Sequence, residues 1–232
     1  MKSSVAKVAA AAVALFVPLL AAATALPSVI ISEVSAVGSA STYNADWFEL
    51  TNTGSSALDI TGWKMDDNSN SFASSVALRG VTSIAAGQSV VFLEGTSAGA
   101  SDATLDSNFK TAWFGTAATS VIFGNYGGAQ VGLSATSDAV NIFDSFGDVV
   151  TRVDFGASTA GVSFDNHAGL NNVVLTQKSV VGVNGAFMSA NSGEVGSPGF
   201  AVAPVPEPEI YALTLAGLAL VGVAARRRKN AA

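Results

Sequence analysis

Short apolar runs separated by clusters of small and polar residues fill the middle of the chain. Val, Ile, Phe and Thr are frequent in the runs, whereas Gly, Ser, Asn and Asp occupy the clusters between them. This pattern is typical of β-strands joined by turns, because β-branched and aromatic residues suit a pleated surface. The predicted strands are Val29–Val34, Trp47–Thr51, Leu58–Thr61, Trp63–Asp66, Val81–Ile84, Ser89–Leu93, Ser120–Phe123, Ala139–Phe143, Val149–Phe155 and Val173–Gln177.

The segments between these strands predict turns and one long loop. Ala85–Gln88 and Asp144–Asp148 each contain a glycine that can adopt a positive φ, and we expect a tight turn at both. Gly95–Gly132 follows neither the strand pattern nor a sustained helical period, so we interpret it as a surface loop. Many short strands with glycine-rich turns indicate an all-β sandwich, which we assign to residues 26–200.

Residues 1–25 have the layout of a secretory signal peptide. Two lysines precede the apolar run Val8–Leu20, and Ala23 and Ala25 form the small-residue pattern of a cleavage site. Pro18 would break a long membrane helix, which favours a cleaved signal over the alternative of an uncleaved membrane anchor. We therefore expect the chain to be exported.

Residues 201–232 have a three-part organisation that differs from the β-rich body. The parts are the motif Val205, Pro206, Glu207 and Pro208, an apolar stretch at residues 210–225, and the basic cluster Arg226, Arg227, Arg228 and Lys229. The apolar stretch would form a helix of about 24 Å. It can cross a bilayer core of roughly 30 Å if the arginines reach the interface. Because basic clusters stay in the cytoplasm, we predict a transmembrane helix at 210–225 with the body outside.

This order of motif, apolar helix and basic cluster resembles the sorting signal of PEP-CTERM proteins. The resemblance implies recognition by an exosortase, a membrane-embedded cysteine transpeptidase, and cleavage near Pro206–Pro208. Glu209 departs from the family pattern, which usually has Ser, Thr or Ala there. The resemblance further implies transient residence in the inner membrane, followed by a place at the cell surface or in the exopolysaccharide matrix of a biofilm. The alternative for this tail is a permanent single-span anchor.

The body itself resembles the lamin-tail domain, an immunoglobulin-like β-sandwich. The matching segments are Ile30–Val34, Asp46–Asn52, Leu58–Trp63, Asp66–Asp67, Asp138–Asp144, Val153–Gly156 and Gly196–Gly199. The resemblance covers the chain from about Ser28 to Gly199 and implies the fold. A fold of this kind does not by itself give a molecular function.

Charge and composition limit the chemistry of the body. Between Leu26 and Val205 the chain carries 15 acidic and five basic residues, and this excess of negative charge would repel nucleic acid. The chain has no cysteine, and His167 is its only histidine. Zinc sites and Ser-His-Asp or Cys-His arrangements therefore lack necessary parts. We interpret His167 as a turn residue, and predict no enzymatic activity and no nucleic-acid binding.

One loop is a candidate calcium site. Asp66, Asn68 and Asn70 place oxygen atoms at alternate positions, as calcium-binding loops do. Ser71 and Ala77, however, stand where an EF-hand loop has its glycine and its bidentate glutamate. A solvated turn is the alternative for this loop, and apart from calcium we expect no cofactor.

The aromatic residues suggest a second kind of ligand. We expect Trp113, Phe114 and Tyr126 to be exposed on the long loop, where they could stack on sugar rings. Trp47 and Trp63 are more simply placed in the core, because they lie in predicted strands.

These patterns together predict a non-enzymatic exported protein that presents a β-sandwich as an adhesive, structural or ligand-binding module. The expected partners are an exosortase, the inner membrane through the 210–225 helix, and exopolysaccharide or other surface ligands. The alternatives are a calcium-dependent or carbohydrate-binding module and an enzyme with an unrecognised site.

Overall fold

The computed structural model describes residues 28–36, 38, 41–167, 173–200 and 215–220. The chain divides into two compact units, Leu26–Pro206 on the one hand and Met1–Ala25 with Glu207–Ala232 on the other. Of the second unit, only residues 215–220 are described, and they are helical and exposed. No helix within the described ranges is both long and apolar enough to cross a bilayer. The predicted signal peptide and the rest of the 210–225 helix lie outside the described residues.

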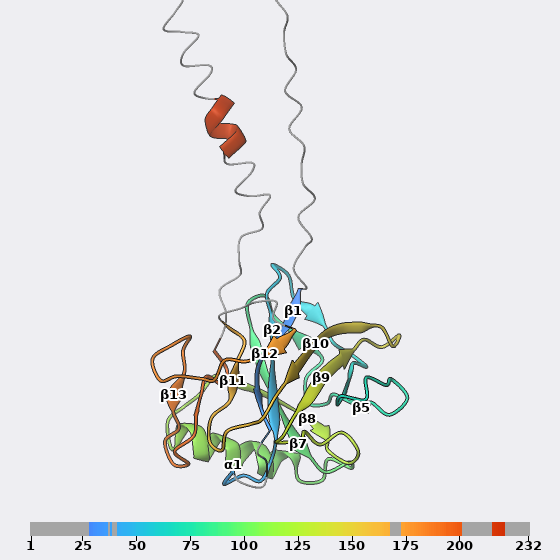
Figure 1. The fold of residues 1–232 in the computed structure, drawn as a ribbon, viewed down its shortest axis with the longest axis vertical. Helices are drawn as coiled ribbons and strands as arrows, with labels where there is room; N and C mark the ends of the chain where they lie inside the picture. Colours follow the sequence, from blue (N-terminus) through green and yellow to red (C-terminus); the bar gives the residue numbers. More distant parts are fainter. Residues whose placement is uncertain (1–27, 37, 39–40, 168–172, 201–214, 221–232) are drawn as a thin grey trace, which may run out of the picture. The chain divides into compact units, whose positions relative to one another are not determined.

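The first unit is built from two five-stranded sheets (Figure 1). The first sheet has the order β11 (Phe164–Asp165), β1 (Val29–Ser35), β2 (Trp47–Asn52), β7 (Ser89–Gly95) and β8 (Ile122–Gly127). The second sheet has the order β12 (Val174–Leu175), β10 (Val149–Phe155), β9 (Asp138–Phe143), β4 (Lys64–Asp66) and β5 (Val76–Ala77). Two small ribbons complete the set, β3 (Leu58–Asp59) with β6 (Ser83–Ile84) and β13 (Phe187–Met188) with β14 (Val195–Gly196).

Most strand pairs are antiparallel, and this confirms the prediction of an all-β domain. The exceptions are the pairs β7–β8 and β10–β12, which are parallel. Every strand predicted from the sequence overlaps a strand of the structure, and β5, β11, β13 and β14 are additional strands of two residues each. Both predicted turns are also present, because Gly87 and Gly147 have φ values of 71° and 94°.

The main hydrophobic core lies between the two sheets. Phe48, Leu50, Val90 and Phe92 contribute from the first sheet, and Met65, Val140, Ile142 and Val153 from the second. Trp63 precedes β4 and is 7% exposed, so its predicted core position is confirmed. Side chains alternate across a strand, so on β7 the even-numbered Val90 and Phe92 enter this core while Val91 and Leu93 point to the opposite face.

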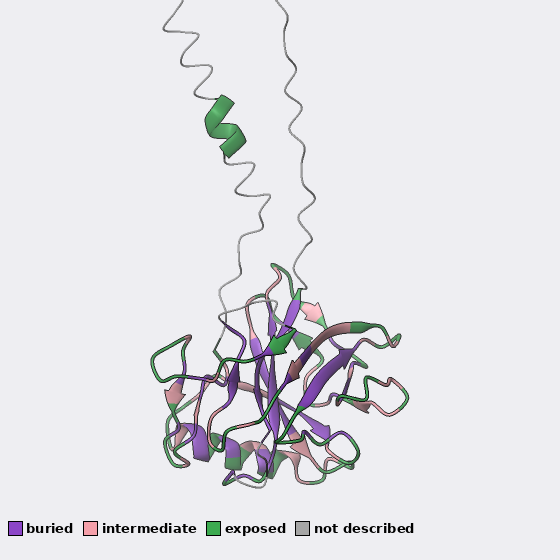
Figure 2. Cartoon of the chain, in the orientation of Figure 1, coloured by how far each residue is buried: buried purple, intermediate pink, exposed green. Residues whose placement is uncertain are grey.

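That opposite face of the first sheet carries a helix that the sequence analysis missed. The predicted surface loop at 95–132 is wrong, because it contains α1 (Asp102–Phe114), while β8 in the same segment overlaps the predicted strand Ser120–Phe123. The buried residues of α1 are Leu105, Phe109, Ala112 and Trp113, spaced as one face of a helix. They pack on Trp47, Val91 and Leu93 in a second hydrophobic cluster. Figure 2 shows the buried and exposed stretches that alternate along α1.

Candidate functional site

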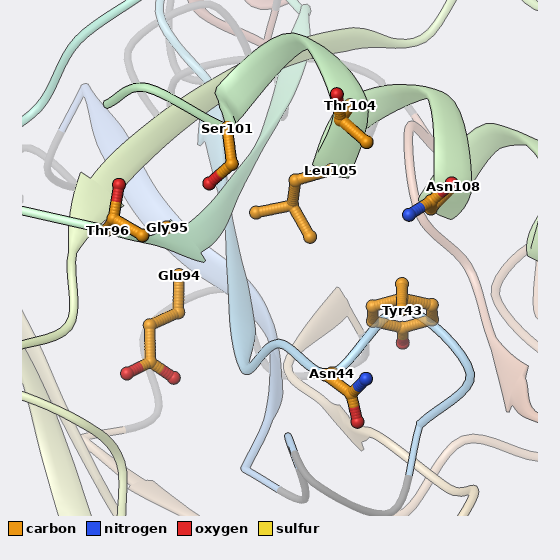
Figure 3. Close-up of a pocket in the computed structure, with 9 residues that line it drawn as sticks. All are labelled: Tyr43, Asn44, Glu94, Gly95, Thr96, Ser101, Thr104, Leu105 and Asn108. Carbon is orange, nitrogen blue, oxygen red and sulfur yellow. The ribbon is translucent and has the colours of Figure 1, made fainter. Parts of the chain in front are cut away.

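A pocket of about 360 Å³ opens between the first turns of α1, the end of β7 and the loop before β2 (Figure 3). Its lining residues are Tyr43, Asn44, Glu94, Gly95, Thr96, Ser101, Thr104, Leu105 and Asn108. In Figure 3, Leu105 and Asn108 of α1 face Tyr43 and Asn44. The pocket therefore depends on α1, the element without a clear signal in the sequence.

The pocket combines an apolar base with polar side chains. Leu105 and Tyr43 are buried, whereas Asn44, Thr104 and Asn108 are exposed. The side chains of these three exposed residues make no hydrogen bond to another described residue. Amide and hydroxyl groups around an apolar base can bind a small polar ligand, because they fix its orientation while the base excludes water.

Tyr43 reaches the pocket with its ring but not with its hydroxyl group. The hydroxyl donates to Glu194 Oε1 at 2.9 Å and accepts from Trp47 Nε1 at 3.1 Å and Trp113 Nε1 at 3.3 Å. Burial, with the Glu194 charge in second place, raises the pKa of Tyr43, so the hydroxyl stays protonated. These bonds fix the ring as a rigid wall of the pocket.

A buried polar cluster, Glu33, Glu49, Asp165 and His167, lies on the same face of the first sheet, beyond α1. Glu33 and Glu49 are opposite each other on β1 and β2 and are 0% exposed. The Ser197 N–H donates to Glu33 Oε1 at 2.8 Å, and the Ser197 hydroxyl donates to Oε2 at 3.0 Å. The segment that closes the domain therefore supplies the donors that a buried carboxylate requires.

His167 provides the positive charge of this cluster. Its Nδ1 lies 3.0 Å from Asp165 Oδ1, and its Nε2 lies 3.4 Å from Glu49 Oε1. Burial alone would lower the pKa of His167, but the hydrogen bonds to Asp165 and Glu49 raise it to about 10. The ring is thus protonated at neutral pH. The interpretation of His167 as a turn residue missed this role as a buried ion-pair partner.

Two acidic members of the cluster, Glu33 and Asp165, have pKa values shifted in opposite directions. Burial, followed by the charge of Glu49, raises the pKa of Glu33 to about 7. Burial acts in the same direction on Asp165, but hydrogen bonds from His167 and Asn184 outweigh it and lower the pKa of Asp165. All these groups have partners within the fold. We therefore interpret the cluster as one that stabilises the fold rather than as a reaction centre.

The candidate calcium loop forms its own hydrogen bonds. Asp66 is 0% exposed, and its Oδ2 accepts from the Ser69 hydroxyl and from the Ser71 N–H, both at 2.7 Å. Asn68 and Asn70 are exposed, and Asn70 has a φ of 49°. The site residues Asp66, Asn68 and Asn70 thus lie in one loop, and calcium binding there stays a prediction.

The predicted exposure of two aromatic residues is wrong. Trp113 is 2% exposed and Tyr126 is 0% exposed, because α1 and β8 direct them into the two hydrophobic clusters. Phe114 is half-buried and packs on Phe187 with 5.8 Å between the ring centroids. Stacking of sugars on Trp113 and Tyr126 is therefore not available, whereas the prediction for the half-buried Phe114 stays open. The prediction for Trp47, which is 0% exposed, is confirmed.

The sorting residues cannot be placed in the fold. The predicted cleavage site at Ala23 and Ala25, the motif at 205–208 and the basic cluster at 226–229 all lie outside the described residues. The cleavage site at Ala23 and Ala25 rests on the sequence alone, whereas the tail at 204–229 is also matched by a family model.

Comparison with protein families gives two matches. The model of the PEP-CTERM protein-sorting motif matches residues 204–229, which implies export, processing by an exosortase and sorting to the cell surface. A search of curated proteins found no match. The model of the Lamin Tail Domain matches residues 22–157, more than half of the chain. The β-sandwich described above agrees with that match, and the chain belongs to the lamin tail domain family.

Proposed function

We propose that this chain is a non-enzymatic surface or matrix protein, in which an exosortase-processed tail delivers a lamin tail domain that acts as an adhesive, structural or ligand-binding module. The observation that carries the proposal is the sorting motif at 204–229, directly after a closed β-sandwich. Its titratable cluster is internally paired, and this supports a binding or structural role rather than catalysis.

The proposed route has three steps. Cleavage after Ala25 removes the signal peptide, the apolar stretch 210–225 holds the domain transiently at the inner membrane, and an exosortase cuts near Pro206–Pro208. Release then places residues 26–200 at the surface or in an exopolysaccharide matrix. The short apolar stretch and the basic cluster at 226–229 support this route, because they suit a temporary anchor.

Intact mass spectrometry of the protein from its host, measured by cell fraction, tests this route. We expect a species outside the inner membrane that lacks residues 1–25 and everything after the Pro206–Pro208 region. A Glu207→Ala variant should keep its tail and stay in the inner membrane. A wild-type chain that retains residues 210–229 in the inner membrane would make the tail a simple anchor and would refute the proposal.

A saccharide is the ligand that the pocket supports best. Sugar hydroxyls need several amide and hydroxyl partners beside a flat apolar wall, and Asn44, Thr104 and Asn108 beside the Tyr43 ring offer that combination. The excess of acidic residues in the body favours a neutral saccharide over an anionic one.

Calorimetric titration with the host's own exopolysaccharide fragments tests the saccharide proposal. Asn44→Ala and Asn108→Ala should each weaken binding about tenfold, which corresponds to the loss of one or two hydrogen bonds. Ser107→Ala is the matched control, because Ser107 is an exposed residue of α1 that does not line the pocket. Equal affinities for all three variants and the wild type would exclude this pocket as the binding site.

A further inference from the structure

Three polar side chains stand side by side at one end of the first sheet. Leu93 on β7 pairs with Trp47 on β2, and the next N–H, that of Glu94, donates to the Asp46 carbonyl at 2.9 Å. Glu94 in turn pairs with Tyr126 on β8. Asp46, directly before β2, thus lies beside Glu94 on β7 and Tyr126 on β8, and their side chains point to the core side of the sheet.

The backbone bond between Glu94 and Asp46 makes the two residues neighbours, and the charge of Glu94 acts on the Asp46 carboxyl group. Asp46 is 6% exposed, and its Oδ1 accepts a hydrogen bond from the Gly38 N–H. In Figure 3 the carboxyl group of Glu94 points away from α1 and so away from the pocket. Two carboxylates in contact repel each other unless a proton or a cation lies between them.

Two glycines next to this pair leave room for the Glu94 carboxyl group. A Cβ added at Gly128 would overlap the Glu94 carboxyl group, and one added at Gly132 would lie 3.2 Å from Glu94 Oε1. Glycine at both positions therefore allows the backbone to approach the carboxyl group closely. The carboxyl group of Glu94 is thus confined against the backbone of Gly128 and Gly132.

The Tyr126 hydroxyl supplies an independent sign of a missing partner. It is fully buried and has no hydrogen-bond partner among the described residues. Of the charged groups that act on it, Glu94 is the strongest and Asp46 the second. A buried hydroxyl without a partner reduces the free energy of unfolding by about 1–3 kcal/mol, so such groups usually bind a water molecule or an ion.

The nearby positive charge does not neutralise the pair. Arg79 donates to Asp102 through Nε at 2.5 Å and through Nη2 at 2.9 Å, and is held there. None of the ion pairs found among the described residues involves Asp46 or Glu94. Among the described residues, the two carboxyl groups therefore have no cationic partner.

We propose that Asp46, Glu94 and the Tyr126 hydroxyl form a binding site for a divalent cation of the calcium class. Every ligand is an oxygen atom, and this favours a hard cation such as Ca²⁺ over zinc or copper. The cation removes the repulsion between the carboxylates and gives the hydroxyl oxygen a partner. No third acidic side chain converges on this point within the described residues, so water molecules complete the coordination. This site is distinct from the Asp66 loop. It shares Glu94 with the lining of the proposed saccharide pocket, but the Glu94 carboxyl group points away from that pocket.

Thermal unfolding of the full chain in detergent, with CaCl2 or with a chelator, tests this site. At a CaCl2 concentration 100-fold above Kd, Tm should rise by about 5–10 °C. Asp46→Asn and Glu94→Gln should each abolish the rise and still fold, because an amide can donate to the remaining carboxylate. Asn68→Ala, in the other acidic loop, is the matched control and should keep the full rise.

Two results would overturn the proposal. The first is a wild-type Tm that does not respond to CaCl2, which would leave a shared proton between the carboxyl groups. The second is a rise that survives in Asp46→Asn and is lost in Asn68→Ala, which would place calcium in the Asp66 loop.

Tyr126→Phe provides a measurement that does not depend on the acid variants. Loss of the hydroxyl should raise the Kd for Ca²⁺ about tenfold in a calorimetric titration, because one ligand is removed. In chelator this variant should be as stable as the wild type or more stable, since the unpartnered hydroxyl is gone. An unchanged Kd would remove Tyr126 from the site and contradict the proposal.

Discussion

Replacement of His167 by alanine should strongly destabilise the lamin tail domain. The variant removes the positive charge that lies 3.0 Å from Asp165 Oδ1 and 3.4 Å from Glu49 Oε1. The side chains of all three residues are at most 4% exposed, so water cannot replace the lost partner without a rearrangement of the core. Two carboxylates would then be buried without a counter-charge.

The size of the effect follows from the burial of the pair. Removal of one partner from a buried ion pair costs about 3–5 kcal/mol. For a domain of this size, a loss of 1 kcal/mol lowers Tm by about 2–4 °C. We therefore expect His167→Ala to lower Tm by roughly 6–20 °C at pH 7, measured by circular dichroism.

The exposed pair Arg152–Asp154 provides the control. Its side chains are 29% and 45% exposed, and such surface pairs contribute about 0–1 kcal/mol. Asp154 is the partner to change, because Arg152 also donates to the buried Asn141. Asp154→Ala should therefore lower Tm by no more than about 4 °C. If His167→Ala lowers Tm no more than Asp154→Ala does, the buried polar cluster does not stabilise the domain as described.

The pH dependence of wild-type stability checks the same reasoning. The pKa of His167 is raised from 6.5 to about 10 in the folded state, so the folded protein holds this proton more tightly than the unfolded chain. Its contribution is fully present below about pH 6.5 and is lost as the pH rises through about 10. A urea midpoint that stays constant or rises between pH 7 and pH 10 would contradict this assignment.

Three further predictions concern other parts of the fold. Gly128→Ala should cost about 1–3 kcal/mol in urea unfolding, because its Cβ would overlap the Glu94 carboxyl group, whereas Gly156→Ala, with no atom within 4 Å, should have little effect. Trp113→Ala should cost about 3–5 kcal/mol, since it empties the centre of the cluster beneath α1; a loss below 1 kcal/mol would contradict that packing. The pKa of Glu33 is raised from 4.5 to about 7 in the folded state, so the stability linked to this proton is present below about pH 4.5 and is lost as the pH rises through about 7. Replacement of Glu33 by Gln should therefore reduce the fall of the urea midpoint over that range.

The strands could be predicted from the sequence because their signal is local. On β2, β7, β9 and β10, apolar and β-branched residues form short runs between turn residues, and each run became a strand. The turn glycines, Gly87 and Gly147, are equally local signals, because their positive φ is a property of one residue and its neighbours.

The helix α1 could not be predicted with the same means. Only four of its residues are buried, and Ser, Thr, Asp and Asn, which are poor helix formers, occupy much of the rest. Its stability comes from the contacts of Phe109 and Trp113 with Trp47 on β2, some 60 residues earlier in the chain. The pocket was missed for the same reason, since α1 forms one side of it.

The buried polar cluster could be recognised in part from the sequence. Glu33 and Glu49 are charged residues inside runs that otherwise predict fully buried strands. Such residues require partners inside the protein. The sequence could not identify those partners, because Ser197 is 164 positions away from Glu33 and no local pattern connects them.

The distance along the chain between Glu33 and Ser197 has a consequence for the order of events during export. The first strand contains a carboxylate whose donors belong to the last residues of the domain. Until Ser197 has been synthesised and moved across the membrane, that carboxylate has no partner and the first sheet cannot reach its final stability. We therefore expect the chain to remain unfolded throughout its passage and to complete its fold only when the sorting tail enters the membrane. On the proposed route, folding would in this way be delayed until the protein is already on the side where it is needed.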